Sequence, residues 1–282
     1  MGTFLVFQET ETRLPKGKTM PRLLFALFFL AGLAQSRADD FQWPREGQIA
    51  AIVLTYDDTL QSHLDIAIPQ LDAAKLKGTF FLGANMTPEA MVRWRTVAGN
   101  GHELGNHTLF HPCPRAILPD RKQFLTEDYD VGRMMMEVGA MNLILFGIDG
   151  QRVRTLSAPC SQTIVGGVDY TSELRRSGFV KFVRTGGDQY NSVVTNFRML
   201  DPFAIPSYGP LDKPGGATLI AYVDRVRAAH GLGVFQFHGV GGDYLDVTAQ
   251  AHQALIDHLK KHPDVWVATF REVMDYVSTH SR

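Results

Sequence analysis

Cysteine is scarce in this chain of 282 residues, which contains only Cys113 and Cys160. At most one disulfide can therefore form within the chain. Basic and acidic residues nearly balance, 28 against 29, and neither sign forms a long run. A protein that binds nucleic acid usually concentrates positive charge on one face, so the sequence argues against nucleic acid as a partner. The chain also lacks internal repeats and low-complexity tracts, which argues against a repeat architecture.

The remaining composition is that of an ordinary globular enzyme. Hydrophobic residues make up 45% of the chain and charged residues 20%. A chain of this length and composition can bury one large core, so a single catalytic domain is the simplest interpretation.

The N-terminal segment has the pattern of a secretory signal. Three basic residues precede the apolar run LLFALFFLAGLA, and a small-x-small cleavage site follows at residues 36–38. This pattern predicts a signal peptide over residues 1–38, with Met20 as an alternative start, and a mature domain over residues 39–282. The run is short for a membrane span, which needs about 20 residues, so we expect a secreted or periplasmic protein without a span after cleavage.

Each cysteine lies beside a proline, in a segment that we expect to line the active site. Export would permit a disulfide between Cys113 and Cys160. The alternative is a pair of small buried thiols, and the sequence leaves both open.

Short, almost continuously apolar segments alternate with helical patterns along the mature chain. Strands of this kind are buried on both faces, as in parallel sheets covered by helices. The expected strands are AAIVLTYDD, KGTFFLG, TLSAPC, VKFVRT, VFQFHG and VWVATF. The expected helices cover residues 62–78 with an interruption at Pro69, a segment that starts at Thr87, and residues 127–146, 171–177, 217–229 and 249–262. The alternation predicts an α/β fold with one closed or nearly closed (β/α) barrel; a doubly wound open sheet is the alternative.

Polar residues follow several of these strands. Asp57 and Asp58 end the first strand, and adjacent side chains on an extended chain point in different directions. One carboxylate could therefore bind a metal while the other faces a substrate. His107 and His111 stand four residues apart, a spacing that would place both imidazoles on one side of a helical turn. Two histidines and a carboxylate form a common set of ligands for a hydrolytic zinc site. His238 follows another strand and precedes glycines, where it could act as an acid.

The motifs TYDD, HTLFH and FHGVGG, in this order, resemble those of the polysaccharide deacetylase family, also called the NodB-homology domain or carbohydrate esterase family four. The resemblance covers nearly all of the chain after the signal. It implies a distorted or incomplete (β/α) barrel of the NodB type. It also implies that Asp57 is the general base, that Asp58, His107 and His111 bind a metal, and that His238 is the general acid.

A further motif of the family, which falls between HTLFH and FHGVGG and is called the third motif, departs from the family pattern in this chain. Many members carry an arginine close to the proline of this motif, whereas this chain reads RTLSAPCS with Arg154 further away. Arg184, at the end of another strand, is the candidate that would orient Asp57. A backbone N–H at Pro159-Cys160 is the oxyanion donor that the resemblance implies.

The Asp-Trp motif of the family is missing as well. Asp201, Asp243 and Asp246 are the candidates that could orient the His238 imidazole in its place. His63, which lies in an expected first helical turn, is the other histidine of interest.

These features predict a metal-dependent hydrolase that acts on an acetylated carbohydrate. Removal of N-acetyl groups from an amino-sugar polymer is the main hypothesis, and O-acetyl ester hydrolysis, as on acetylxylan, is the alternative. A carbohydrate-binding pseudo-enzyme without activity is a third hypothesis. The expected cofactor is a divalent metal, with zinc as the first choice and cobalt or nickel as alternatives. The sequence does not indicate an oligomeric state.

Overall fold

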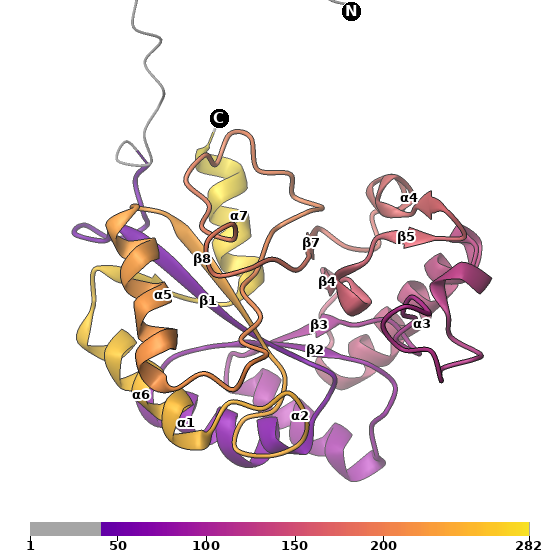
Figure 1. Ribbon diagram of the computed structural model, residues 1–282, viewed down its shortest axis with the longest axis horizontal. Coiled ribbons are helices and arrows are strands. Elements are labelled where there is room, and N and C mark those ends of the chain that lie inside the picture. The colour runs from indigo at the N-terminus through magenta and orange to yellow at the C-terminus, as the bar shows by residue number, and fades with distance from the viewer. Residues whose placement is uncertain (1–40, 282) are drawn as a thin grey trace, which may run out of the picture. The chain divides into compact units, whose positions relative to one another are not determined.

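The computed structural model describes residues 41–281 (Figure 1). The signal peptide predicted over residues 1–38, and the alternative start at Met20, lie outside the described residues.

A parallel sheet forms the centre of the fold, and every pairing within it is parallel. Across the sheet the order is β7 (Phe182–Arg184), β4 (Thr155–Ser157), β3 (Glu103–Asn106), β2 (Thr79–Leu82), β1 (Ala50–Asp57) and β8 (Leu232–Phe237). Strand β9 (Val265–Val267) pairs with the first half of β1, on residues 50–52, and β2 pairs with its second half, on residues 55–57. The six predicted strands are therefore all present. Strand β3 was not predicted.

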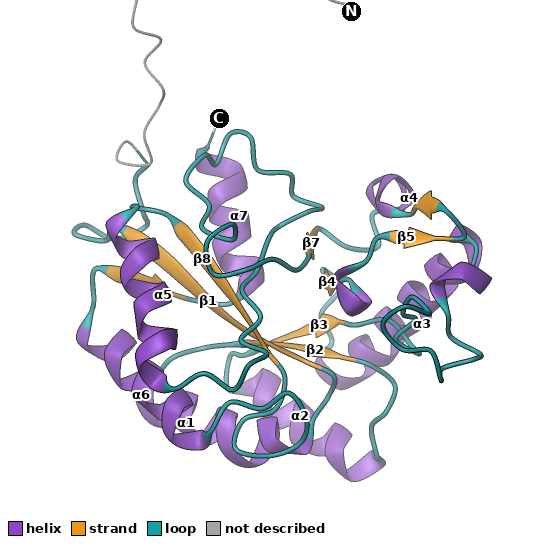
Figure 2. Ribbon diagram, in the orientation of Figure 1, coloured by secondary structure: helices purple, strands orange, loops and turns teal. Residues whose placement is uncertain are grey.

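Helices flank this sheet (Figure 2). They are α1 (Ile68–Ala74), α2 (Pro88–Gly99), α3 (Val131–Asp149), α4 (Thr171–Ser177), α5 (Gly216–Ala228), α6 (Ala249–Lys261) and α7 (Phe270–His280). Shorter elements are the π-helical turn η2 (His63–Ala67), the 3₁₀ turns η3 (Thr126–Asp128) and η4 (Pro159–Ser161), and the hairpin of β5 (Ile164–Val165) and β6 (Val168–Asp169). The predicted helices are all present, whereas α7 was not predicted.

Two details of the predicted helix boundaries are confirmed and one is wrong. The π-helical turn precedes Pro69, and the regular helix α1 begins at this point. Thr87 caps α2, because its side-chain oxygen accepts a hydrogen bond from the N–H of Ala90 at 3.2 Å. Helix α1 does not extend to Gly78, because Lys75 adopts a left-handed conformation with φ of 59° and ends it.

The two faces of β1 contribute to different parts of the core. Ile52 and Leu54 belong to a cluster with residues of α1, α5 and α6. Ala51 and Val53 belong to a second cluster, which includes residues of α7. All eight residues of β1 are buried, which explains why its sequence is apolar without alternation.

The segment 205–208 connects the two edges of the sheet. On one side the N–H of Ile205 donates to the carbonyl of Val183 in β7 at 3.0 Å. On the other side the N–H of Tyr208 donates to the carbonyl of Val234 in β8 at 2.8 Å. This irregular segment curls the sheet into a distorted barrel, so the predicted barrel is confirmed over the open-sheet alternative.

Helix α3 is, among the described residues, the one helix long and apolar enough to cross a membrane by length and composition. Its Met134, Val138, Met141 and Leu145 are buried inside the fold. A buried core helix has the same composition, so this helix is weak evidence for a membrane span.

Replacing Gly105 with alanine tests the close packing beneath β3. A Cβ atom at this position would lie within 2.5 Å of Phe81 Cε1 and 3.1 Å of Thr155 Oγ1. We expect Gly105→Ala to lower the free energy of unfolding by about 1–3 kcal/mol, because the buried Phe81 ring must move. Urea denaturation measures this change.

The matched control is Gly147→Ala in α3, where an added Cβ meets no atom within 4 Å. It should leave stability unchanged or raise it by about 0.5–1 kcal/mol. Equal stability of Gly105→Ala and the unmodified protein would contradict the packing argument.

Candidate active site

The candidate site lies at the carboxyl ends of three strands of the sheet, β1, β3 and β8. Asp57 and Asp58 stand at the end of β1, His107 follows β3, and His238 follows β8. The predicted convergence of polar residues at this edge of the barrel is therefore confirmed.

Three side chains form a cluster that could hold a metal ion. Oδ1 of Asp58 lies 3.3 Å from Nε2 of His107 and 3.3 Å from Nε2 of His111. These three atoms lie within 4.8 Å of one another. One carboxylate and two imidazoles fit a divalent transition metal such as zinc, with room for a further ligand.

The chain reaches this arrangement without a helical turn, so that part of the prediction is wrong. Thr108 and His111 have φ of 61° and 53°, which reverses the backbone between the two histidines. The side chain of Asn106 accepts from the N–H of Thr108 at 2.7 Å. The hydroxyl of Thr108 accepts in turn from the N–H of His111 at 3.0 Å. A hydrogen-bonded loop, not helical spacing, therefore brings the imidazoles together.

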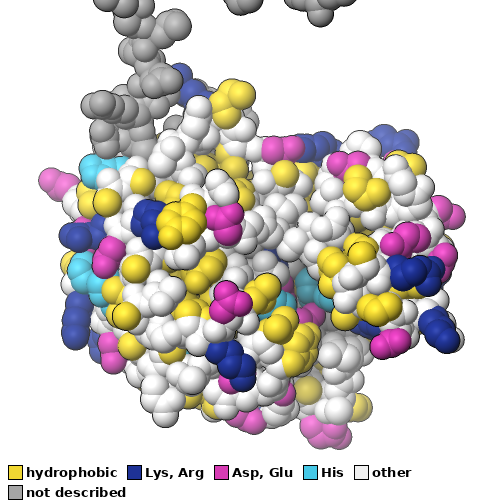
Figure 3. Space-filling view, viewed as in Figure 1, with side chains coloured by type: hydrophobic (Ala, Val, Ile, Leu, Met, Phe, Trp, Pro, Cys, Tyr) yellow, Lys and Arg dark blue, Asp and Glu magenta, His cyan; other side chains and the backbone are white. Residues whose placement is uncertain are grey.

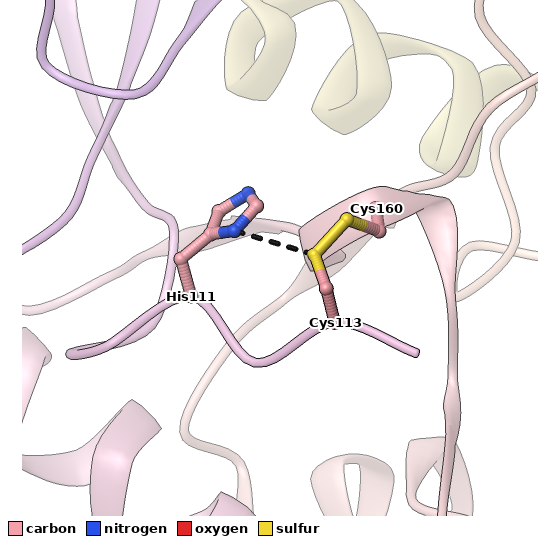
Figure 4. Close-up of side chains that lie close together, drawn as sticks. All are labelled: His111, Cys113 and Cys160. Atoms are coloured by element: carbon pink, nitrogen blue, oxygen red, sulfur yellow. Dashed lines mark hydrogen bonds between the residues drawn. A yellow bond between two sulfur atoms is a disulfide. The ribbon is translucent and has the colours of Figure 1, made fainter. Parts of the chain in front are cut away.

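Each imidazole is oriented through its second nitrogen. Nδ1 of His107 donates to the carbonyl of Ser157 at 2.8 Å. Nδ1 of His111 lies 3.5 Å from Sγ of Cys113, which forms a disulfide with Cys160 (Figure 4). Carbonyl and disulfide sulfur can only accept, so Nδ1 carries the proton and Nε2 keeps its lone pair in both rings.

The disulfide joins two parts of the site, with a Cα–Cα distance of 5.7 Å. Of the two alternatives from the sequence, the structure contains the bridge and not the pair of thiols. The same two cysteines and His111 lie close enough to form a second metal-binding group. Because both sulfurs belong to the disulfide, they are not available as thiolate ligands.

Three donors converge on one oxygen of Asp57, which is buried. Oδ2 is hydrogen-bonded by Arg184 Nη2, by Ser157 Oγ at 3.3 Å and by Gln236 Nε2 at 3.2 Å. Oδ1 is buried and has no partner among the described residues. Arg184 thus contacts Asp57, as expected from the sequence, and its role in orienting the proposed base stays a prediction.

The charge environment of Asp57 favours its ionised form. Burial by itself would raise the pKa of this carboxyl. The positive charges of Arg184, His107 and His238 outweigh burial, so the pKa of Asp57 lies below its ordinary value. The group is a carboxylate at neutral pH.

Arg184, and not Arg154, is the arginine that contacts Asp57. It pairs in register with Ser157 across β7 and β4, and its Nη1 donates to Ser207 at 2.9 Å. Arg154 instead forms a buried ion pair with Asp149 at 2.6 Å, away from these groups. Ser157 and Gln236 were not predicted as site residues from the sequence. Gln236 is the polar residue within the otherwise apolar strand VFQF, and this irregularity could have identified it.

His238 lies beside the carboxylates, with Nε2 3.6 Å from Asp58 Oδ2. Burial lowers its pKa, and the charges of Asp57 and Asp58 oppose this shift only in part. Its Nδ1 is buried and has no partner among the described residues.

None of the three predicted orienting residues contacts this imidazole in the described part of the chain. Asp201 pairs with Arg175, Asp243 accepts from a backbone N–H, and Asp246 pairs with Lys213. The prediction is wrong because each carboxylate is satisfied by a partner from another part of the chain.

His63 contacts the backbone of His238 instead. It is fully buried, and burial lowers its pKa to about 4, so the ring is neutral. Its Nε2 donates to the carbonyl of His238 at 2.8 Å. His63 therefore supports the main chain that carries the proposed acid.

The segment Pro159–Ser161 forms the 3₁₀ turn η4 at the end of β4. Cys160 and Ser161 have φ of 50° and 58°, and the disulfide holds this turn next to the loop that carries His111. The oxyanion role of a backbone N–H at Pro159-Cys160 stays a prediction.

A cavity of about 420 Å³ opens beside the cluster. Asp58, His107 and His111 line it together with Tyr244, and its other walls include Leu60, Leu109, Phe110, Leu118 and Arg121. Figure 3 shows histidine side chains within a hollow on this face. The candidate metal ligands can thus be reached from solvent.

Comparison with known proteins supports the family resemblance. Residues 45–165 match the family model of polysaccharide deacetylases. Functionally curated proteins gave no match.

Solved structures show the same fold. A Mycobacterium smegmatis protein assigned to the polysaccharide deacetylases is 16% identical over 84% of this chain and 93% of its own, with a TM-score of 0.59. The peptidoglycan deacetylase PdaC from Bacillus subtilis is 19% identical over 83% and 95%, with a TM-score of 0.53. A mutant of BA3943, a pseudoenzyme of carbohydrate esterase family four, is 16% identical over 80% and 68%, with a TM-score of 0.54. At these identities the likeness concerns the fold.

Removing the disulfide should destabilise the protein. Its two cysteines are separated by 47 residues, and closing such a loop reduces the entropy of the unfolded chain. We expect the double variant Cys113→Ser/Cys160→Ser to lose about 4 kcal/mol of unfolding free energy. Urea denaturation of the two proteins measures the difference. Titration of the unreduced, unfolded protein should detect no free thiol, and two reactive thiols per chain would contradict the bridge.

Proposed function

We propose, from the match of residues 45–165 to the family model of polysaccharide deacetylases, that this protein is a metal-dependent hydrolase that removes acetyl groups from a carbohydrate. N-acetyl groups of an amino-sugar polymer are the proposed substrate. The observation that carries the proposal is the buried carboxylate of Asp57, which has one oxygen held by three donors and the other without a partner.

Asp58, His107 and His111 would hold the metal ion. Their three ligand atoms lie within 4.8 Å of one another, and the hydrogen bonds of both rings leave the Nε2 lone pairs available. A mixed nitrogen and oxygen set suits zinc first, with cobalt or nickel as alternatives. When bound, such an ion supplies Lewis-acid catalysis and makes a water molecule more acidic.

Asp57 would act as the general base in this reaction. Its free Oδ1 can accept a proton from the attacking water, while Oδ2 remains bound to Arg184, Ser157 and Gln236. Because three donors fix the carboxylate, the base does not need to reorient during the reaction. The ion pair with Arg184 also keeps Asp57 ionised before the substrate arrives.

His238 would act as the general acid. As the bond between the acetyl carbon and the sugar nitrogen breaks, protonated Nε2 can donate to the departing amine. The backbone N–H at Pro159-Cys160 would donate to the oxygen of the acetyl carbonyl as negative charge develops there. The products are acetate and the free amino sugar.

Ester hydrolysis would use the same base and acid, since only the leaving group would change from an amine to an alcohol. A purely carbohydrate-binding role is less well supported. The three proposed metal ligands form one cluster, the proposed base Asp57 pairs with Arg184, and the proposed acid His238 lies beside Asp58.

We extend the proposal to export from the cytoplasm. Disulfides persist mainly in oxidising compartments, and the bridge between Cys113 and Cys160 is consistent with a secreted or periplasmic protein.

Removal and replacement of the metal tests the reaction class. We expect the chelator-treated protein to release no acetate from chitin oligomers, peptidoglycan or acetylxylan. Added zinc should restore release from at least one amino-sugar substrate, because the cluster is rebuilt. Released acetate is measured with a coupled enzymatic assay.

Two results would count against this proposal. Release from acetylxylan alone would favour the ester alternative. Tight zinc binding without acetate release from any of the three substrates would favour a binding role.

Asp57→Asn tests the general base. The amide has the shape of the carboxylate but cannot accept a proton in the same way, so we expect kcat to fall by about 10²–10⁴. Zinc affinity should change little, because Asp57 is not a member of the ligand cluster. Steady-state kinetics and a zinc titration measure the two effects.

The control is Asp65→Asn, at a surface carboxylate that pairs with Arg93 at 2.7 Å. This variant should keep the unmodified kcat. Near-normal turnover by Asp57→Asn would show that another group is the base.

A further inference from the structure

We propose that Tyr244 is a positioning residue for the metal ligand Asp58, holding one carboxylate oxygen so that the other faces the two histidines. The phenol O–H donates to Oδ2 of Asp58, while Oδ1 lies 3.3 Å from both His107 Nε2 and His111 Nε2. This inference deepens the proposed function, on which it rests for the presence of a metal.

Tyr244 completes a set of outer partners, one for each member of the cluster. His107 is oriented by the carbonyl of Ser157, and His111 by the sulfur of Cys113. Asp58 would lack a comparable fixed partner without the phenol. Outer partners of this kind orient metal ligands and raise the affinity of the site.

The loop that carries Tyr244 is built to hold it in place. Three of its residues have positive φ: 67° at Gly241, 63° at Asp243 and 48° at Leu245. The N–H of Gly239 donates to the carbonyl of Tyr244 at 3.1 Å. The strained loop is thus closed by a direct contact at Tyr244 itself.

A second anchor fixes this loop to the start of the π-helical turn. Oδ2 of Asp243 accepts from the N–H of Ser62 at 2.8 Å. The N–H of Val240 donates to the hydroxyl of Ser62 at 3.1 Å. Both contacts join the loop to Ser62, four residues after Asp58, so the segments that carry the phenol and the carboxylate are held together.

The hydrogen bond from Tyr244 to Asp58 also helps to keep the roles of Asp58 and His238 distinct. Nε2 of His238 lies 3.6 Å from Oδ2 of Asp58, which is beyond hydrogen-bonding distance. With the phenol satisfying Oδ2, the imidazole of His238 stays free to serve as the acid. Asp58 can then act as a ligand only, and Asp57 as the base.

Tyr244→Phe removes the hydroxyl and keeps the ring. Because the side chain is half exposed, the variant should fold normally, which thermal unfolding would verify. We expect the dissociation constant for zinc to rise about 10- to 100-fold. Competition with a chromophoric zinc chelator, on metal-free protein, measures this constant without any substrate.

Two further measurements separate positioning from substrate binding. At saturating zinc, Tyr244→Phe should recover most of the unmodified kcat and keep the unmodified KM. A raised KM with unchanged zinc affinity would overturn the proposal, because it would place the phenol on the substrate. The matched control is Tyr190→Phe, at an exposed tyrosine beside Arg225, which should leave both constants unchanged.

The zinc titration distinguishes this inference from the proposed function. If the unmodified protein binds zinc and Tyr244→Phe binds it weakly, the role of Tyr244 stands even when no acetate is released. If both bind zinc equally and the unmodified protein releases acetate, the function stands and the role of Tyr244 is wrong. Absence of zinc binding by the unmodified protein would overturn both.

Discussion

The buried ion pair between Asp57 and Arg184 is the interaction on which the site depends. Both side chains are removed from water, so either charge alone would carry a large desolvation cost. The pair joins β1 to β7, and Ser157 and Gln236 add contacts from β4 and β8. One carboxylate oxygen therefore connects four strands of the barrel. This arrangement also leaves the second oxygen free for chemistry.

Barrel closure makes this ion pair possible. Strands β1 and β7 are separated by three others in the sheet, so their ends approach only when the sheet curls. The segment 205–208 bonds to β7 and β8 at the same time and brings Ser207 against Arg184. The two adjacent aspartates then have distinct surroundings. Asp57 faces a guanidinium inside the barrel, whereas Asp58 faces imidazoles and the phenol at its mouth.

The errors of the sequence analysis have local physical causes. Strand β3, ELGN, is short and contains Gly and Asn, so propensity does not identify it. The H-x-x-x-H spacing suggested a helix, but the hydrogen bonds of Asn106 and Thr108 stabilise a loop with positive φ. Asp201, Asp243 and Asp246 were expected as candidates to orient His238, yet each pairs elsewhere. Side-chain partners in loops depend on tertiary contacts, which spacing does not encode.

The sequence by itself determined six strands of the sheet and the barrel class, because apolar periodicity records them directly. Its short motifs also identified Asp57, Asp58, His107, His111 and His238 as candidate site residues. Only the tertiary structure decided that Arg184 reaches Asp57 and that the two cysteines are bridged. It also showed that Tyr244 bonds to Asp58. The partners in these pairs lie 127, 47 and 186 residues apart. Contacts over such separations arise from barrel closure and loop geometry, which no local pattern in the chain specifies.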